Sequence, residues 1–82
     1  MLQSIKSLNS DVEFQRARQF LFGTSDPAEL SAKIRCLTGS DPQMSSVQVS
    51  HHRTETEFRF RVGYVSCVAR RKGRIYEVSR AF

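Results

Sequence analysis

Basic side chains, the residues best suited to binding an anion, gather at the C-terminal end of this sequence. Residues 1–52 carry five basic and five acidic side chains, whereas residues 53–82 carry eight basic and three acidic ones, so the whole net charge of +5 lies in residues 53–82. Guanidinium and ammonium groups bind phosphates and carboxylates. This distribution predicts an anionic partner: nucleic acid, an acidic protein surface or a membrane face.

The spacing of the basic residues places some of them on one side of a strand. Phe58, Phe60 and Val62 alternate with Arg59 and Arg61, and a period of two predicts a strand with one apolar and one basic face. The alternative interpretation is a solvated face that keeps a sheet soluble and its edges unpaired. The predicted nucleic-acid-binding residues are Arg59, Arg61, Arg70, Arg71, Lys72, Arg74 and Arg80.

Other residue types that could do chemistry lack the spacing that it requires. His51 and His52 are neighbours, so in a strand they point to opposite faces and cannot share a metal ion. Cys36 and Cys67 have no CxxC spacing, and we expect both to be buried and reduced. There is no Walker, GxGxxG or GxSxG motif. We therefore predict no catalytic residue, metal or cofactor, and the sequence offers no positive case for an enzyme.

The length and hydropathy of the chain limit its class. With 82 residues, we expect one small domain over residues 1–82 with a thin core. The first residues lack the apolar core of a signal peptide, and no stretch approaches the ~20 apolar residues of a membrane span. The sequence predicts a cytoplasmic protein without a membrane span.

Two helices are predicted before the basic region. Ser10 and Glu13 have capping-box spacing, which predicts a helix over about residues 11–22, before Gly23. Its buried side is predicted to hold Phe14, Ala17, Phe20 and Leu21. Residues 1–8 fit either a short edge strand or an extension of this helix. The sequence Asp26-Pro27 starts a second helix over about residues 27–37, Gly39 stops it, and residues 39–46 form a mobile loop.

The remaining residues are predicted to form three strands. A turn at residues 54–55 places Val47 opposite Val62, and residues 57–70 then form one continuous central strand, with a bend or bulge at Gly63. A three-residue loop at residues 71–73, with Gly73 in the left-handed conformation, leads into the last strand. The predicted core face of this sheet consists of Phe58, Phe60, Val62, Val68, Tyr76, Val78 and Phe82.

These elements predict an α+β fold in the order ααβββ: a helical hairpin packed on one face of a three-stranded antiparallel β-meander, with a short N-terminal strand as an option. The aromatic residues then lie under the helices, where they cannot stack on bases. The leading hypothesis is a small basic binding module that presents an arginine-rich hairpin to an anionic partner, nucleic acid first. The alternative is a non-enzymatic protein-interaction or inhibitor domain of a regulatory or phage-like kind. A homodimer through an exposed edge strand is compatible with either.

The stretch FRFRVGYVSCVARRKGRIYEVSR, preceded by two helices, resembles the C-terminal strands of RelE/ParE-type toxins. The resemblance follows the order of elements over the whole chain and the residue pattern from Phe58 to Arg80. It implies a third function, an mRNA-cleaving toxin, in which Arg59, Arg61 and Arg80 contact the phosphates of the mRNA.

Overall fold

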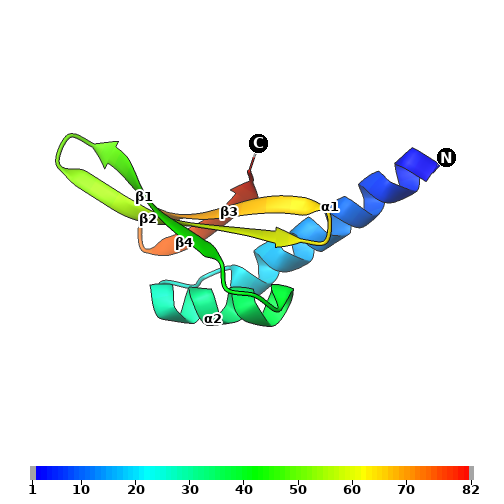
Figure 1. Ribbon diagram of the computed structural model, residues 1–82, viewed down its shortest axis with the longest axis horizontal. Helices are drawn as coiled ribbons and strands as arrows, with labels where there is room; N and C mark the ends of the chain where they lie inside the picture. The colour runs from blue at the N-terminus through cyan, green and yellow to red at the C-terminus, as the bar shows by residue number, and fades with distance from the viewer. Residues whose placement is uncertain (1, 82) are drawn as a thin grey trace.

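The computed structural model describes the backbone of residues 2–81 and the side chains of residues 11–81. Two helices precede an antiparallel sheet (Figure 1), so the predicted α+β order is confirmed, although the sheet has four strands and not three. The elements are α1 (Leu2–Leu21), α2 (Pro27–Thr38), β1 (Gln43–Ser50), β2 (Arg53–Val62), β3 (Val65–Lys72) and β4 (Ile75–Arg80).

Helix α1 is longer than predicted. It is already formed at Leu2, so Ser10 lies inside the helix and is not its N-cap, and of the two options for residues 1–8 the helical extension is correct for the described residues. A capping residue contributes only about 1 kcal/mol, and residues 2–10 contain no glycine or proline that would stop a helix. The helix ends at Leu21, and Gly23 follows with a φ of 81°.

Helix α2 confirms its prediction to within one residue. Pro27 occupies the first turn, where its missing N–H costs no hydrogen bond. Gly39 adopts the left-handed conformation with a φ of 78°, and its N–H donates to the carbonyl of Arg35 at 2.8 Å. The predicted loop is shorter than residues 39–46, because β1 begins at Gln43.

The predicted continuous strand over residues 57–70 is wrong, because the chain reverses at Gly63-Tyr64. Val62 pairs with Val65 across this two-residue loop, and Gly63 has a φ of 60° at the first loop position, as a type II′ turn requires. After the reversal the core positions change from even to odd numbers, so that Phe60 pairs with Cys67. Tyr64, which a continuous strand would place on the core side with Phe58, Phe60 and Val62, lies in the turn and is 82% exposed.

The other two hairpins also differ in register from the prediction. The first turn lies at His51-His52, not at residues 54–55, which places Val47 opposite Glu55 and not Val62. The last loop is Gly73-Arg74, since Lys72 pairs with Ile75, and only the positive φ of Gly73 is as predicted. The sheet order is β1-β2-β3-β4, so each strand pairs with its neighbour in the sequence.

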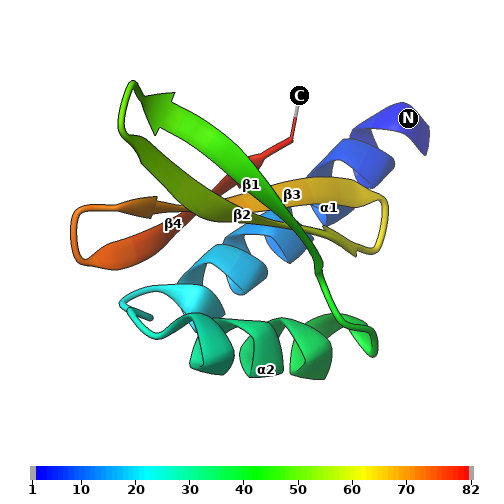
Figure 2. The ribbon, with the colours of Figure 1, turned by 60° about the vertical axis from the view of Figure 1, so that its left-hand side comes forward.

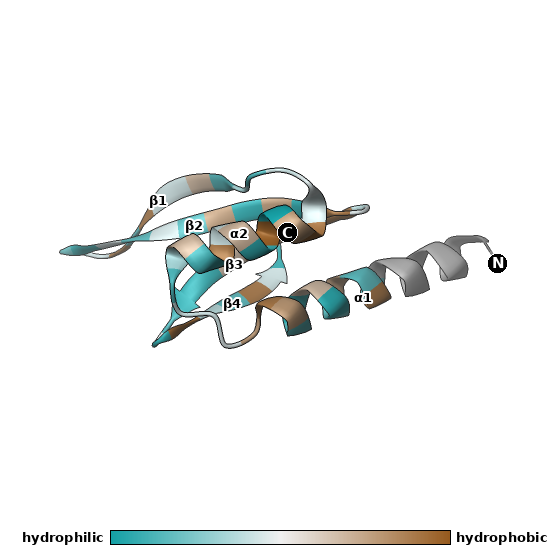
Figure 3. Cartoon of the chain, turned by 90° about the horizontal axis from the view of Figure 1, so that it is seen from below, coloured by the Kyte–Doolittle hydropathy of each residue, from teal (hydrophilic) through white to brown (hydrophobic). Residues whose placement is uncertain are grey.

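Both helices lie on the same face of the sheet (Figures 2 and 3) and enclose the core with it. Val68 is buried as predicted, but its side chain points to the face opposite the helices. Phe20, predicted on the buried side of α1, is 47% exposed. Of the two cysteines predicted to be buried, Cys67 is buried and Cys36 is exposed. The predicted core residue Phe82 lies outside the described residues. The core consists of Ala17, Leu21, Leu30, Ile34, Phe58, Phe60, Val65, Cys67, Ala69, Tyr76 and Val78, with Val62 partly buried against it.

The molecule is elongated, with principal extents of 49 × 25 × 20 Å. The β1–β2 hairpin projects beyond α2 at one end, and the N-terminal part of α1 extends past the sheet at the other (Figure 1). Within the described residues, no helix is long and apolar enough to cross a membrane.

Candidate nucleic-acid interface

The face of the sheet that the helices leave uncovered, called the open face below, carries part of the predicted basic site. The strand registers place Arg59 and Arg61 of β2 there, as predicted, together with Arg70 and Lys72 of β3. The same face holds the acidic residues of the C-terminal region, which are Glu55, Glu57 and Glu77.

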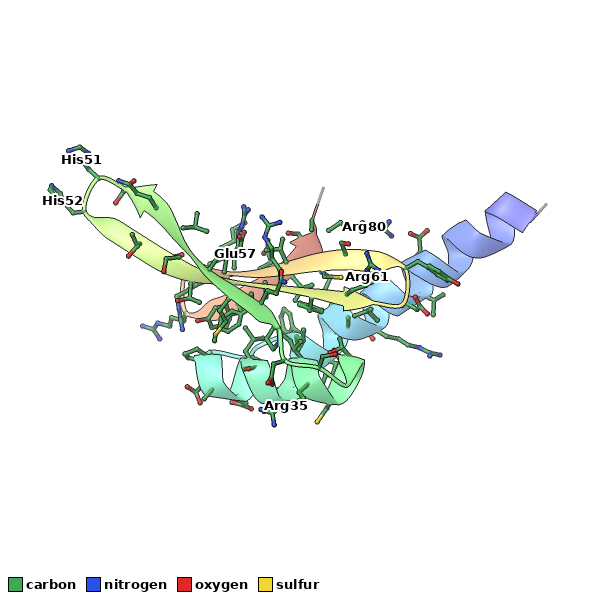
Figure 4. All side chains as sticks on the ribbon, viewed as in Figure 1. Arg35, His51, His52, Glu57, Arg61 and Arg80 are labelled. Atoms are coloured by element: carbon green, nitrogen blue, oxygen red, sulfur yellow. The ribbon has the colours of Figure 1, made fainter. Side chains whose placement is uncertain are left out.

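A buried carboxylate joins two of these arginines. Glu57 is only 3% exposed although no helix covers it. Its Oε1 accepts a hydrogen bond from Nε of Arg70 at 2.5 Å, and its Oε2 accepts one from Nε of Arg59 at 3.2 Å. The Arg70 hydrogen bond, with that of Arg59 in addition, lowers the pKa of Glu57 despite its burial. We call Glu57, Arg59 and Arg70 the Glu57 cluster; Figure 4 shows Glu57 near the middle of the sheet.

The Glu57 cluster leaves the outer ends of both guanidinium groups accessible. Among the described residues, Arg59 and Arg70 use only Nε for their hydrogen bonds, and their side chains are 51% and 61% exposed. The terminal amino groups, which can form bidentate contacts with phosphate or carboxylate, thus make no hydrogen bond with any described residue. Glu57 fixes their position and reduces the entropy that each arginine would lose on binding.

The remaining charges of the open face are partly neutralised. Arg53 pairs with Glu55 at 2.6 Å and Lys72 with Glu77 at 3.8 Å, whereas Arg61 forms no ion pair with any described residue. The face carries five basic residues (Arg53, Arg59, Arg61, Arg70 and Lys72) and three acidic ones, so its formal charge is +2.

The other three predicted binding residues lie elsewhere. Arg71 is on the helix face, where its guanidinium lies 4.6 Å from the centroid of the Tyr76 ring and donates to the carbonyls of Ser25 and Arg74 at 2.7 and 3.1 Å. Arg74 is in the last turn.

Arg80 also faces the helices. It pairs with Asp11 of α1, and its guanidinium lies 5.1 Å from the centroid of the Phe14 ring. The structure therefore does not bring Arg80 together with Arg59 and Arg61, the set that the toxin resemblance implies.

A hollow of about 590 Å³ adjoins the basic face at the end of β2. Arg59, Arg61 and Ser66 line it on the sheet side, while Thr38 at the end of α2 and Asp41 in the following loop line the other side. Asp41 is paired with Arg35 at 2.8 Å. The hollow therefore adds polar side chains beside Arg61.

The two histidines lie in the β1–β2 turn and not in a strand. Both are exposed at the tip of the projecting hairpin (Figure 4), and their ring centroids are 5.1 Å apart. Within the part of the chain that the structure describes, no group of three or more His, Cys, Asp or Glu side chains could hold a metal ion.

Sequence reasoning missed Glu57, the residue around which the site is built. The spacing of Glu57 and Arg59 by two residues places both on one face of a strand, and this signal was available in the sequence. Arg70 comes into contact with Glu57 only because the chain turns at Gly63-Tyr64, which the continuous-strand prediction excluded. Comparison with known protein families, curated proteins and solved structures finds no significant match to this chain.

Proposed function

We propose that the open face binds the phosphate backbone of nucleic acid. The observation that carries the proposal is the Glu57 cluster beside Arg61. Three arginines lie on one uncovered face, and two of them are held at Nε by Glu57, with more than half of each side chain exposed. Arg59 and Arg61 are two residues apart on one strand, a separation of roughly 7 Å. Such a pair can contact successive phosphates of one strand.

The distribution of aromatic side chains favours contacts with the backbone over stacking on bases. Phe58, Phe60 and Tyr76 are buried beneath the helices, so the described residues of the open face between the turns offer no aromatic platform. Proteins that bind single strands usually combine such a platform with basic residues. We therefore propose binding with little sequence preference, in which a duplex is bound at least as well as a single strand.

The test is a titration of labelled duplex DNA, single-stranded DNA and RNA by fluorescence anisotropy at several salt concentrations. Three phosphate contacts correspond to a slope of log K against log salt of about −2 to −3. Replacing Arg61 by alanine removes one contact without breaking an ion pair, so it should reduce affinity several-fold and lower the slope by about one. The matched control is Arg16→Ala with Arg18→Ala, which removes two exposed charges from α1 and should have the smaller effect.

Absence of binding at low salt contradicts the proposal, and so does an Arg61→Ala variant that binds as well as the unaltered protein. Circular dichroism of each variant shows whether the fold is retained.

A protein surface that carries basic as well as acidic side chains is the second candidate partner, in line with the protein-interaction alternative. The interspersed Glu55, Glu57 and Glu77 favour it, because a surface of mixed charge complements another mixed surface better than it complements a uniform polyanion. A partner that is retained after nuclease treatment and lost in Arg61→Ala supports this candidate. A cytoplasmic location and a homodimer through a sheet edge remain proposals as well.

A further inference from the structure

The two edges of the sheet are treated differently. The edge of β4 is occupied near its start: the N–H of Tyr76 donates to the carbonyl of Thr24 at 2.9 Å, and Arg71 donates to the carbonyl of Ser25 beside it. The outer edge of β1 pairs with no described strand. Unpaired edges in folded proteins are usually protected by charged residues, proline or short strand length. Strand β1 is eight residues long and reads QMSSVQVS, without charge or proline.

The segment of β2 that pairs with β1, residues 53–59, has no formal net charge, although the chain carries +5. The two arginines of this segment are paired with its two glutamates, Arg53 with Glu55 and Arg59 with Glu57, and Arg61 lies beyond the part of β2 that pairs with β1. A second copy of the chain can therefore approach this edge without like-charge repulsion. A charged partner strand would find no free opposite charge on β1.

Apolar side chains are exposed on the same strand. Met44 is 65% exposed, Val49 is 55% exposed and Val47 is partly buried. A hollow of about 290 Å³ is lined by Val47 and Val49 together with Glu55 and Arg70 of the neighbouring strands. Pairing of this edge would remove part of this apolar surface from water.

We infer that a second copy of this chain pairs with β1, antiparallel and about a two-fold axis perpendicular to the sheet. Such an axis requires a residue to face itself, and the register with Val47 opposite Val47 of the second copy places Gln48 opposite Ser46. It brings the two valines together on the open side, away from the helices. The two four-stranded sheets then form one continuous sheet.

This symmetry has a consequence for the open face. A two-fold axis perpendicular to the sheet keeps both open faces on the same side, so the dimer presents two Glu57 clusters to one partner. The inference itself does not depend on the proposed function, since pairing is measured without any ligand. The backbone of one short strand buries less surface than a standard interface of about 1,600 Å², so we expect a weak, concentration-dependent dimer.

The experiment is sedimentation equilibrium of the full chain, free of nucleic acid, from roughly 5 to 500 µM, the range in which such small interfaces dissociate. The average mass should rise from 9.4 kDa toward twice that value. Val47→Lys places like charges against each other, and its mass should stay at 9.4 kDa. Ser79→Lys, the same new charge on the exposed outer strand β4, is the matched control and should still dimerise.

Mixing Val47→Lys with Val47→Glu supplies opposite charges at the seam and should restore the dimer. This rescue also shows that the lysine variant is folded. A wild-type mass that stays at 9.4 kDa at the highest concentration overturns the inference. Dimerisation that is lost in Ser79→Lys and kept in Val47→Lys overturns it too, because the contact would then lie at the other edge.

Discussion

On the helix face of the sheet, Arg71 and Arg80 are bound within the protein: they lie over Tyr76 and Phe14, and they contact a backbone carbonyl and a carboxylate of the helical half. On the open face, Arg59 and Arg70 form hydrogen bonds and ion pairs with Glu57 alone among the described residues, and more than half of each side chain is exposed. Arginines that are close together in the sequence therefore have different roles: those on the helix face contact the helical half, and those on the open face remain available to a ligand. A count of basic residues overestimates the binding surface, because successive residues of a strand point to opposite faces of the sheet. An arginine on the helix face holds the helices, and only one on the open face can bind a ligand.

The largest expected effect on stability comes from removing a buried apolar side chain, and it should differ between the helix face and the open face of the sheet. Phe58→Ala removes a ring that is 1% exposed and packs edge-to-face on Tyr76 with centroids 5.5 Å apart, so it should cost about 3–5 kcal/mol. Val68→Ala removes a smaller side chain from the open face and should cost about 1–2 kcal/mol. Urea denaturation measures both. A Val68 variant as unstable as the Phe58 variant would mean that both faces contribute equally to the core.

An intermediate effect should separate the two kinds of arginine. Arg71→Ala removes two hydrogen bonds to carbonyls and the contact with the Tyr76 ring, and we expect a loss of about 1–2 kcal/mol. Arg74→Ala, the same change in the adjacent turn, should alter stability by less than about 0.5 kcal/mol. Thermal denaturation compares the stabilities of the two variants. Equal stability of both would contradict the conclusion that Arg71 holds the helical half against the sheet.

The smallest effect is a pH dependence at the Glu57 cluster. Because the pKa of Glu57 in the folded protein is below its ordinary value of 4.5, the carboxylate stabilises the fold fully above that pH and less as the pH falls through the folded pKa. Glu57→Gln should be less stable by about 1 kcal/mol at neutral pH, since its partners are half exposed, and the difference should shrink below pH 4.5.

The comparison is a series of unfolding curves at different pH values. The control, Glu77→Gln, alters an exposed carboxylate and should change stability little at any pH. A difference between Glu57→Gln and wild type that grows toward acid pH would contradict the assigned role of the carboxylate.

The sequence was sufficient for the features that depend on local signals. Pro27 and Gly39 set the limits of α2, and the alternation of Phe58 and Phe60 with Arg59 and Arg61 identified the two faces of β2. The strand registers could not be predicted from such local signals, because each register depends on the position of a two-residue turn. A shift of that turn by one residue moves every later side chain to the other face of the sheet.

The turn at Gly63-Tyr64 shows the cost of one such shift. Read as part of a continuous strand, these residues place Tyr64 and Val68 on the core face, whereas the reversal exposes Tyr64 and moves Val68 to the open face. The same reversal brings Arg70 to Glu57, and so the centre of the candidate site was predicted only in part. The turn requires a positive φ at its first position, which Gly63 supplies. In the sequence, however, a glycine inside a strand pattern fits a bulge equally well.

The strand order β1-β2-β3-β4 has a consequence for how the chain folds. Every strand pairs with the one next to it in sequence, so the sheet grows through short loop closures, which are fast. Among the described residues, one backbone hydrogen bond, from Tyr76 to Thr24, links the helical half to the sheet. The helices are synthesised first, but the sheet residues that complete their core are assembled only when β2 to β4 have paired, so docking of the helices on the sheet is the step that completes the core.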